Sequence, residues 1–158
     1  MRVRVALGFV LLTAVFAAPL LAAGGGGDSS AEEWSFKSKE FRAGHDAIGK
    51  QDFRQAIAWF SQAAAASPKD ADAANYLGYA HRKLGDFESA LKFYNRALEL
   101  NPKHLGALEY LGEAYLELQD LPKAKDQLAK LDDICWLGCK EYRDLKAAIR
   151  DYEKKAQR

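Results

Sequence analysis

The stretch LDDICWLGCKEY, residues 131–142, contains both cysteines of the chain, Cys135 and Cys139. Two thiols at this spacing can form a disulfide, act as a reversible redox pair or bind a metal ion. A metal site needs further ligands, and none of the three histidines adjoins the pair in sequence. Covalent haem attachment needs a histidine directly after the second cysteine, where Lys140 stands. The choice depends on the compartment and on the elements that position the two cysteines.

The N-terminal segment has the three-part layout of a secretory signal peptide. Two arginines precede an apolar run over residues 5–21, and two alanines at 22 and 23 supply the small residues of a cleavage site. An uncleaved membrane anchor is the alternative, because the apolar stretch with its alanines spans 19 positions. Pro19 and the small-residue end favour cleavage. We therefore expect a signal peptide over residues 1–23, a flexible leader over residues 24–36, and a periplasmic or secreted mature chain without stable membrane insertion.

The charge balance and the motifs argue against several classes of function. The chain has 23 Lys and Arg against 22 Asp and Glu, and loss of the two N-terminal arginines leaves 21 against 22, a net charge of −1. Such a balance lacks the basic stripe that nucleic-acid binding needs. No nucleophile–base constellation stands out, and the glycine run at 24–27 lacks the Lys-Ser/Thr of a phosphate-binding loop. The sequence predicts no catalytic residue, no cofactor, no metal site and no nucleic-acid partner.

The body of the chain repeats itself with a period of 34 residues. Residues 37–70, 71–104 and 105–138 align without a gap. The middle line carries the pattern most fully, at Leu77, Gly78, Leu84, Gly85, Asp86, Ala90, Tyr94, Ala97 and Pro102. A fixed period of this length indicates a stack of identical two-helix units.

This pattern resembles the tetratricopeptide repeat, and the resemblance covers about 102 of the 158 residues. It implies an all-α fold, a right-handed solenoid of three helix–turn–helix units at residues 37–70, 71–104 and 105–138. Residues 139–158 are expected to form a C-terminal capping helix and tail. Their apolar stripe is made of Tyr142, Leu145, Ile149 and Tyr152, and a repeat stack needs a polar-faced cap. A partner-binding amphipathic helix is the alternative for this segment.

Local chemistry supports the same elements. Asp52, Asp86 and Asp120 each precede an apolar-periodic segment, which suits a helix N-cap. A glycine recurs where the two helices of a unit must approach closely. The third unit departs from the pattern, with Gln119 at the turn glycine and Pro122 in the first turn of its second helix, where no hydrogen bond is lost.

On this map Cys135 lies at the end of the sixth helix and Cys139 at the start of the seventh. Gly138 between them can adopt the left-handed conformation that ends a helix, and this turn permits disulfide geometry. In an oxidising compartment we expect a structural disulfide that fixes the capping helix to the third repeat. A reversible redox or metal-binding pair and free thiols remain the alternatives.

The resemblance also implies a concave groove lined mostly by first helices. Its wall is expected at Phe41, His45, Asn75, Tyr79, Arg82, Lys83, Glu109, Glu113 and Glu117. The three glutamates are four residues apart, so on a helix they form an acidic ridge that Arg82 and Lys83 would face. A solvated face with scattered internal ion pairs is the alternative.

The predicted function is that of an exported scaffold that binds a protein or peptide in this groove, not that of an enzyme. Members of the family that clamp a terminal carboxylate use basic and Asn side chains on first helices. The matching positions here are Phe41, His45, Tyr76, Gly106 and Tyr110. None is Lys, Arg or Asn, so aromatic contact with a helix or extended segment is expected instead. A homo-oligomer built through the open first repeat is compatible with this function. The alternative function is a periplasmic redox or metal-handling accessory protein that uses Cys135 and Cys139.

Overall fold

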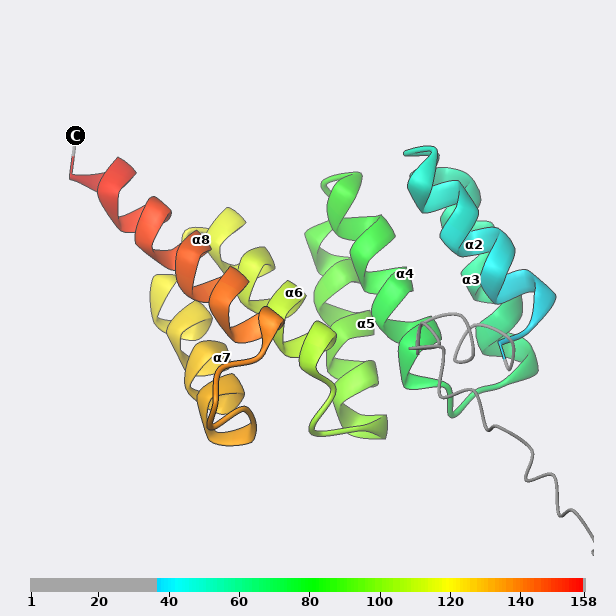
Figure 1. Ribbon diagram of the computed structural model, residues 1–158. Helices are drawn as coiled ribbons and strands as arrows, with labels where there is room; N and C mark the ends of the chain where they lie inside the picture. Colours follow the sequence, from blue (N-terminus) through cyan, green and yellow to red (C-terminus); the bar gives the residue numbers. More distant parts are fainter. Residues whose placement is uncertain (1–36, 158) are drawn as a thin grey trace, which may run out of the picture.

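The computed structural model describes residues 37–157 and consists there of seven α-helices without a strand. The helices are α2 (Lys39–Gly49), α3 (Phe53–Ala66), α4 (Ala71–Lys83), α5 (Phe87–Leu100), α6 (Leu105–Glu117), α7 (Leu121–Ile134) and α8 (Lys140–Ala156). Figure 1 shows helix pairs side by side, from α2 and α3 at one end to α6 and α7 at the other, where α8 packs on them. The all-α solenoid expected from the repeat pattern is confirmed.

Polar side chains start the helices as the sequence predicts. The carboxylates of Asp52, Asp86 and Asp120 accept a hydrogen bond from the backbone N–H three residues on, at the starts of α3, α5 and α7. Pro122 lies in the first turn of α7. His104 caps α6 through Nδ1, which accepts from the backbone N–H of Ala107. These caps fix where each helix begins, because they satisfy N–H groups that have no partner within the helix.

The turn inside each repeat contains one residue in the left-handed region. These residues are Gln51, Gly85 and Gln119, with φ of 58°, 79° and 62°, and they are 34 positions apart. The left-handed region suits glycine, since a Cβ clashes with the following carbonyl group there. Only the middle repeat therefore has an unstrained residue at this position.

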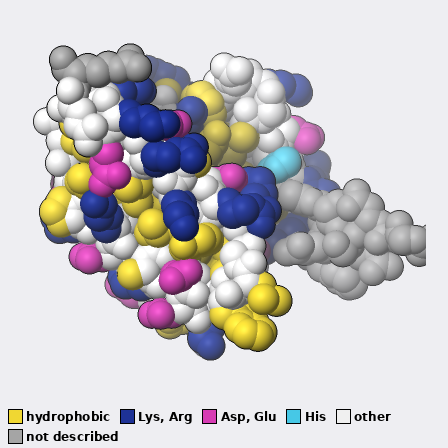
Figure 2. Space-filling view, turned by 60° about the vertical axis from the view of Figure 1, so that its left-hand side comes forward, with side chains coloured by type: hydrophobic (Ala, Val, Ile, Leu, Met, Phe, Trp, Pro, Cys, Tyr) yellow, Lys and Arg dark blue, Asp and Glu magenta, His cyan; other side chains and the backbone are white. Residues whose placement is uncertain are grey.

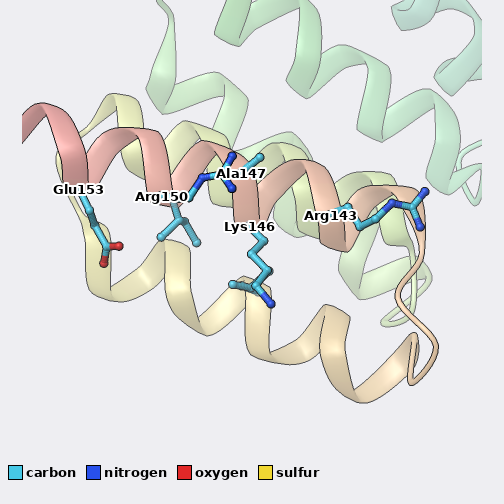
Figure 3. Close-up of a pocket in the computed structure, with 7 residues that line it drawn as sticks. Arg143, Lys146, Ala147, Arg150 and Glu153 are labelled. Carbon is cyan, nitrogen blue, oxygen red and sulfur yellow. The ribbon is translucent and has the colours of Figure 1, made fainter.

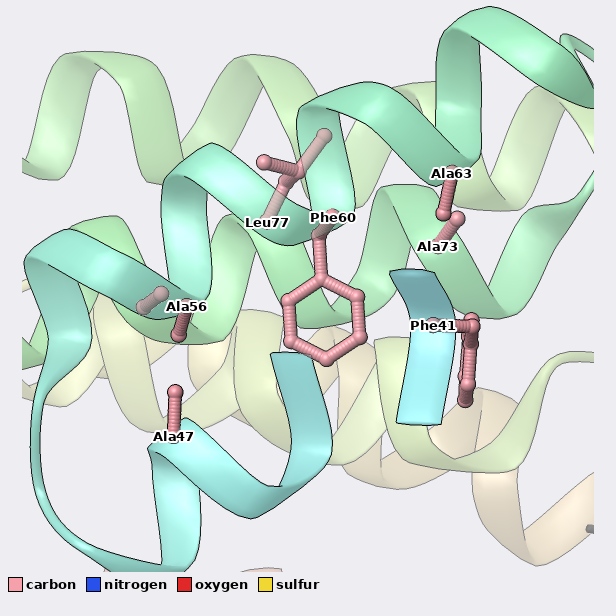
Figure 4. Packing of buried hydrophobic residues seen from close by; sticks show 8 residues of the cluster. Phe41, Ala47, Ala56, Phe60, Ala63, Ala73 and Leu77 are labelled. Carbon is pink, nitrogen blue, oxygen red and sulfur yellow. The ribbon is translucent and has the colours of Figure 1, made fainter. Parts of the chain in front are cut away.

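Close helix packing depends on a second repeated position. A Cβ on Gly44 would lie 2.9 Å from the ring of Phe60, and one on Gly78 would lie 2.6 Å from the ring of Tyr94. Both rings belong to the second helix of the same repeat and are fully buried. Figure 4 shows Phe60 in the middle of the first repeat's core. The predicted close approach of paired helices at the recurring glycine is confirmed in these two repeats.

The third repeat is completed differently, by α8. The residue closest to a Cβ on Gly112 is Leu145 of α8, at 2.5 Å. Leu145 and Ile149 are buried in one cluster with Leu108 and Leu131 of the third repeat. The helix therefore covers the apolar end of the stack, as a cap must.

Two expectations concern residues that the structure does not describe. The signal peptide over residues 1–23 and the leader over residues 24–36 lie outside the described chain. Within residues 37–157 no helix combines the length and the hydropathy needed to cross a membrane.

Candidate functional site

The cysteine pair lies at the junction of the third repeat and the last helix. Cys135 is the C-cap residue of α7, and Cys139 is the N-cap residue of α8. The structure joins them as a disulfide with the Cα atoms 5.5 Å apart, and Gly138 has a φ of 76°. No three metal-binding side chains come together anywhere in the described part of the chain. The geometry is that of a bridge between two helices.

The residues predicted to line the groove divide into two groups. Phe41 is 2% exposed and packs edge-on against Phe60 and Tyr76, with ring centroids 5.2 and 5.5 Å apart. Its assignment to the groove wall is therefore wrong, since the large apolar ring is drawn into the core of the first repeat. His45, one turn further along α2, lies over the edge of the Tyr76 ring at 5.7 Å and is partly exposed.

The other predicted residues meet along α4 and α6. Arg82 is only 7% exposed and joins the acidic ridge: its guanidinium lies 2.7 Å from a Glu113 carboxylate oxygen and 2.5 Å from one of Glu117. Its Nε donates to the hydroxyl of Tyr94 at 3.3 Å. The predicted contact between Arg82 and the acidic ridge is thus present, as an internal ion-pair network. Lys83 is exposed, with its ammonium 5.9 Å from the Tyr79 ring centre.

Two tyrosines form an aromatic seam between α4 and α6. The rings of Tyr79 and Tyr110 are 5.1 Å apart, and the Arg82 guanidinium lies 5.5 and 5.7 Å from their centres. Both rings remain partly exposed. A cation this close to both ring centres is attracted to both, which helps to hold the pair in place.

A polar floor adjoins the seam. Asn75, one turn before Tyr79 on α4, is 4% exposed, and its Oδ1 has no hydrogen-bond partner among the described residues. Its Nδ2 faces the start of α6, 3.4 Å from where a Cβ on Gly106 would stand. Buried acceptors without a partner are rare in folded proteins. We call Asn75, Tyr79, Arg82, Glu109, Tyr110 and Glu113 the α4/α6 face.

Glu109 is a buried carboxyl of this face, and the Lys140 charge at the start of α8 only partly offsets the rise in its pKa. It is 5% exposed, and none of the ion pairs in the described chain includes it. Desolvation raises the pKa of Glu109 to about 7, and the neighbouring Glu113 carboxylate contributes to the rise. The carboxyl therefore gains or loses a proton near neutral pH.

Sequence reasoning gave too little weight to Tyr76 and Tyr110. It named them only as positions where a carboxylate clamp is missing, although both carry the ring contacts of this surface. A pattern was available: the two tyrosines are 34 residues apart, at the same position of consecutive first helices. An aromatic residue repeated at a partly exposed position indicates a contact surface.

Comparisons with known proteins agree with this architecture. A family model described as "Anaphase-promoting complex, cyclosome, subunit 3" matches residues 49–131, just over half of the chain. The TPR2B domain of yeast Sti1, in a complex with pHsp70, has a TM-score of 0.68 and 19% identity, with 80% of this chain and 98% of that chain covered.

Two further solved structures are similar. The Sgt2 TPR domain from Aspergillus fumigatus has a TM-score of 0.66 and 22% identity, covering 75% of this chain and 78% of that one. The first TPR of Spaghetti (RPAP3), bound to the HSP90 peptide SRMEEVD, has a TM-score of 0.64 and 20% identity, covering 71% and 91%. The comparison with curated protein sequences finds no match.

Proposed function

Because this chain belongs to the tetratricopeptide-repeat family, we propose that it is a protein-interaction scaffold whose α4/α6 face binds a segment of a partner protein. The observation that carries the proposal is the seam of Tyr79 and Tyr110, braced by Arg82. Tyr and Arg are the residues that dominate binding energy in protein interfaces, most of all where they are held rigidly.

The polar groups beside the seam suit a peptide ligand. The unpartnered Oδ1 of Asn75 can accept a hydrogen bond from a ligand N–H once local side chains shift to admit it. Arg82 is one cation shared by Glu113 and Glu117, so this network keeps a net negative charge that favours a neutral or basic segment. Aromatic rings provide apolar contact area, and the two carboxylates provide selection by charge.

The mode of binding differs from carboxylate clamping. The RPAP3 domain noted above is bound to a peptide ending in Glu-Glu-Val-Asp, which carries several negative charges. Here Phe41 is buried, Tyr76 and Tyr110 carry no charge, and Arg82 is already paired with two glutamates. The proposed ligand is therefore an internal or basic segment of a protein and not an acidic C-terminus.

Site-specific photocrosslinking tests the proposal. Replacement of Tyr79 by a photoreactive phenylalanine derivative should capture a partner in the native host. The same derivative at Lys92, an exposed position on α5, should not capture that partner. Tyr79→Ala should weaken binding of the captured protein. Equal capture from positions 79 and 92, or none from 79, would contradict the proposed face.

We also propose that the chain is exported and that Cys135 and Cys139 form a structural disulfide. The layout of the N-terminal segment and the helix junction at the pair support both parts. Intact mass of the mature protein should show loss of residues 1–22 or 1–23 and no uptake of an alkylating reagent without reductant. Two alkylated cysteines on cleaved protein would instead favour a redox or metal-handling role.

A further inference from the structure

The 34-residue register continues beyond the third repeat into α8. Leu77, Leu111 and Leu145 are 34 positions apart, and each is at most 2% exposed. The first two lie in the first helices α4 and α6, so α8 stands where the first helix of a fourth repeat would stand. Figure 1 shows α8 packed at the end of the stack, and no described residue occupies the place of a second helix beside it.

The surface that such a second helix would cover is a groove between α7 and α8. It is lined by Leu128, Arg143, Lys146, Ala147, Ile149, Arg150 and Glu153 and has a volume of about 360 Å³. We call it the α7/α8 groove. Figure 3 shows Lys146 and Glu153 extending from α8 toward the ribbon of α7 below it.

The groove is present because the third repeat departs from the pattern at Leu128. The matching residues of the first two repeats, Phe60 and Tyr94, are rings with 0% exposure. Leu128 is smaller and only partly buried, and its side chain forms part of the apolar floor with Ala147 and Ile149.

A second departure makes the groove selective. Lys146 stands 34 positions after Gly112 and 68 after Gly78, at the position where glycine admits a neighbouring side chain. A lysine there prevents the close approach seen in the repeats and offers a cation to whatever lies in the groove. A helix that packs as closely as those of the repeats would therefore fit this groove poorly. A helix with acidic side chains along its flanks would fit it well, because they can pair with Lys146.

Three cations form the rim, and the one ion pair that includes any of them in the described chain is the long contact between the adjacent residues Arg150 and Asp151. Arg143 donates to the carbonyl oxygen of Gly138, Lys146 donates to the Tyr142 hydroxyl, and Arg150 is 3.8 Å from Asp151. Glu153, the one acidic lining residue, is bound to Lys125 at 2.6 Å. Figure 2, which brings this end forward, shows several Lys and Arg side chains gathered around hydrophobic ones.

We propose that the α7/α8 groove binds an acidic amphipathic helix of a partner protein, which takes the place of the second helix of a fourth repeat. Apolar side chains of that helix would contact Leu128 and Ala147, which are partly exposed, and its acidic flanks would pair with Arg143, Lys146 and Arg150. This is helix-in-groove recognition, in which apolar anchors supply contact area and the charged rim sets partner choice.

An anionic membrane surface is the competing occupant, because Trp136 and Leu137 at the disulfide loop are 85% and 83% exposed. Two observations favour the helix. A flat bilayer cannot enter a groove, whereas a helix can. Exposed Asp132 and Asp133 lie in the last turn of α7, shortly before this apolar tip, and they would be repelled by anionic lipid.

The test uses the mature chain and a fluorescently labelled, side-chain-stapled helical peptide with leucines on one face and glutamates on both flanks. We expect binding by anisotropy that weakens about tenfold in the double variant Lys146→Glu with Arg150→Glu. A second peptide with lysine in place of each glutamate should prefer the double variant over the unaltered chain. The matched control, Lys92→Glu with Lys103→Glu, changes the net charge equally at exposed positions elsewhere and should bind the acidic peptide unchanged.

Other outcomes would overturn the proposal. They are absence of binding at about 1 mM acidic peptide, equal loss in the control variant, or failure of the charge-reversed peptide to restore binding. Binding to vesicles containing phosphatidylglycerol without binding to the acidic peptide would assign the surface to a membrane instead. Tyr79→Ala should leave this binding intact, so the result does not depend on the α4/α6 face.

Discussion

Two glycine-to-alanine substitutions should have opposite effects on stability, because their backbone conformations differ. A Cβ would meet nothing within 4 Å at either Gly49 or Gly85. Gly85 has a φ of 79°, whereas Gly49 is the last residue of α2 and lies outside the left-handed region. The pair therefore isolates the backbone contribution from any steric effect of the new methyl group.

The magnitudes follow from two opposing contributions. The left-handed conformation costs a residue with a Cβ about 1–2 kcal/mol. Alanine in turn restricts the unfolded chain and gains about 0.5–1 kcal/mol relative to glycine. We expect Gly85→Ala to lower the free energy of unfolding by about 1 kcal/mol, and Gly49→Ala to raise it by about 0.5–1 kcal/mol. In a domain of this size, 1 kcal/mol shifts Tm by about 4 °C.

The same reasoning predicts the reverse change at the two strained glutamines. Gln51→Gly and Gln119→Gly remove the left-handed penalty and should each raise the free energy of unfolding by up to about 1 kcal/mol. The two turns are separated by a whole repeat, so the effects should add in the double variant. Urea unfolding followed by circular dichroism measures the four single variants and the double variant. Shifts of the same sign for Gly49→Ala and Gly85→Ala would refute the reasoning.

Three further predictions concern the α4/α6 face. Arg82→Ala should lower the free energy of unfolding by about 1–3 kcal/mol, because it leaves the Glu113 and Glu117 carboxylates without their cation and the Tyr94 hydroxyl without its donor. Tyr79→Ala is therefore the cleaner test of binding. Burial raises the pKa of Glu109 to about 7 from an ordinary 4.5, so its carboxyl is harder to ionise in the folded chain than in the unfolded one. Its contribution to the free energy of unfolding should fall as pH rises from about 4.5 to 7, by at most about 3 kcal/mol. Glu109→Gln should therefore raise the free energy of unfolding measured at pH 8 and change it little at pH 4. The peptide SRMEEVD, which the RPAP3 domain binds, should show no calorimetric binding at about 1 mM, and saturable binding would show that this face accepts an acidic terminus.

Local rules account for what could be predicted from the sequence. The N-cap aspartates act through hydrogen bonds to residues three positions on, and Gly44 and Gly78 act through close contact with a ring in the same repeat. Such interactions recur at a fixed spacing, so an alignment of the chain with itself reveals them. The paired helices and the starts of the second helices followed from this alone.

The groove wall was harder to predict, because the sizes of the neighbouring side chains decide whether a residue faces the groove or packs into the core. Phe41 occupies a position that faces the groove in the repeat pattern, yet its ring is buried and packs edge-on against Tyr76 and Phe60. Asn75 is an ordinary polar residue in sequence, and only the packed structure shows that its Oδ1 lacks a partner. Side-chain volume and hydrogen-bond satisfaction are properties of several helices together, so periodicity along one helix does not determine them.

The two departures at Leu128 and Lys146 bear on where function lies in a repeat protein. Positions that keep the pattern are constrained by packing between neighbours, so they cannot vary to suit a ligand. Leu128 replaces a buried ring and Lys146 replaces a glycine, at adjoining positions on α7 and α8. Either change alone would weaken the end of the stack. Leu128 leaves space that a ring fills in the other repeats, and Lys146 prevents the close approach of a second helix. Together they produce an apolar floor with a cationic rim, a combination that stabilises a bound acidic helix better than it stabilises the chain itself.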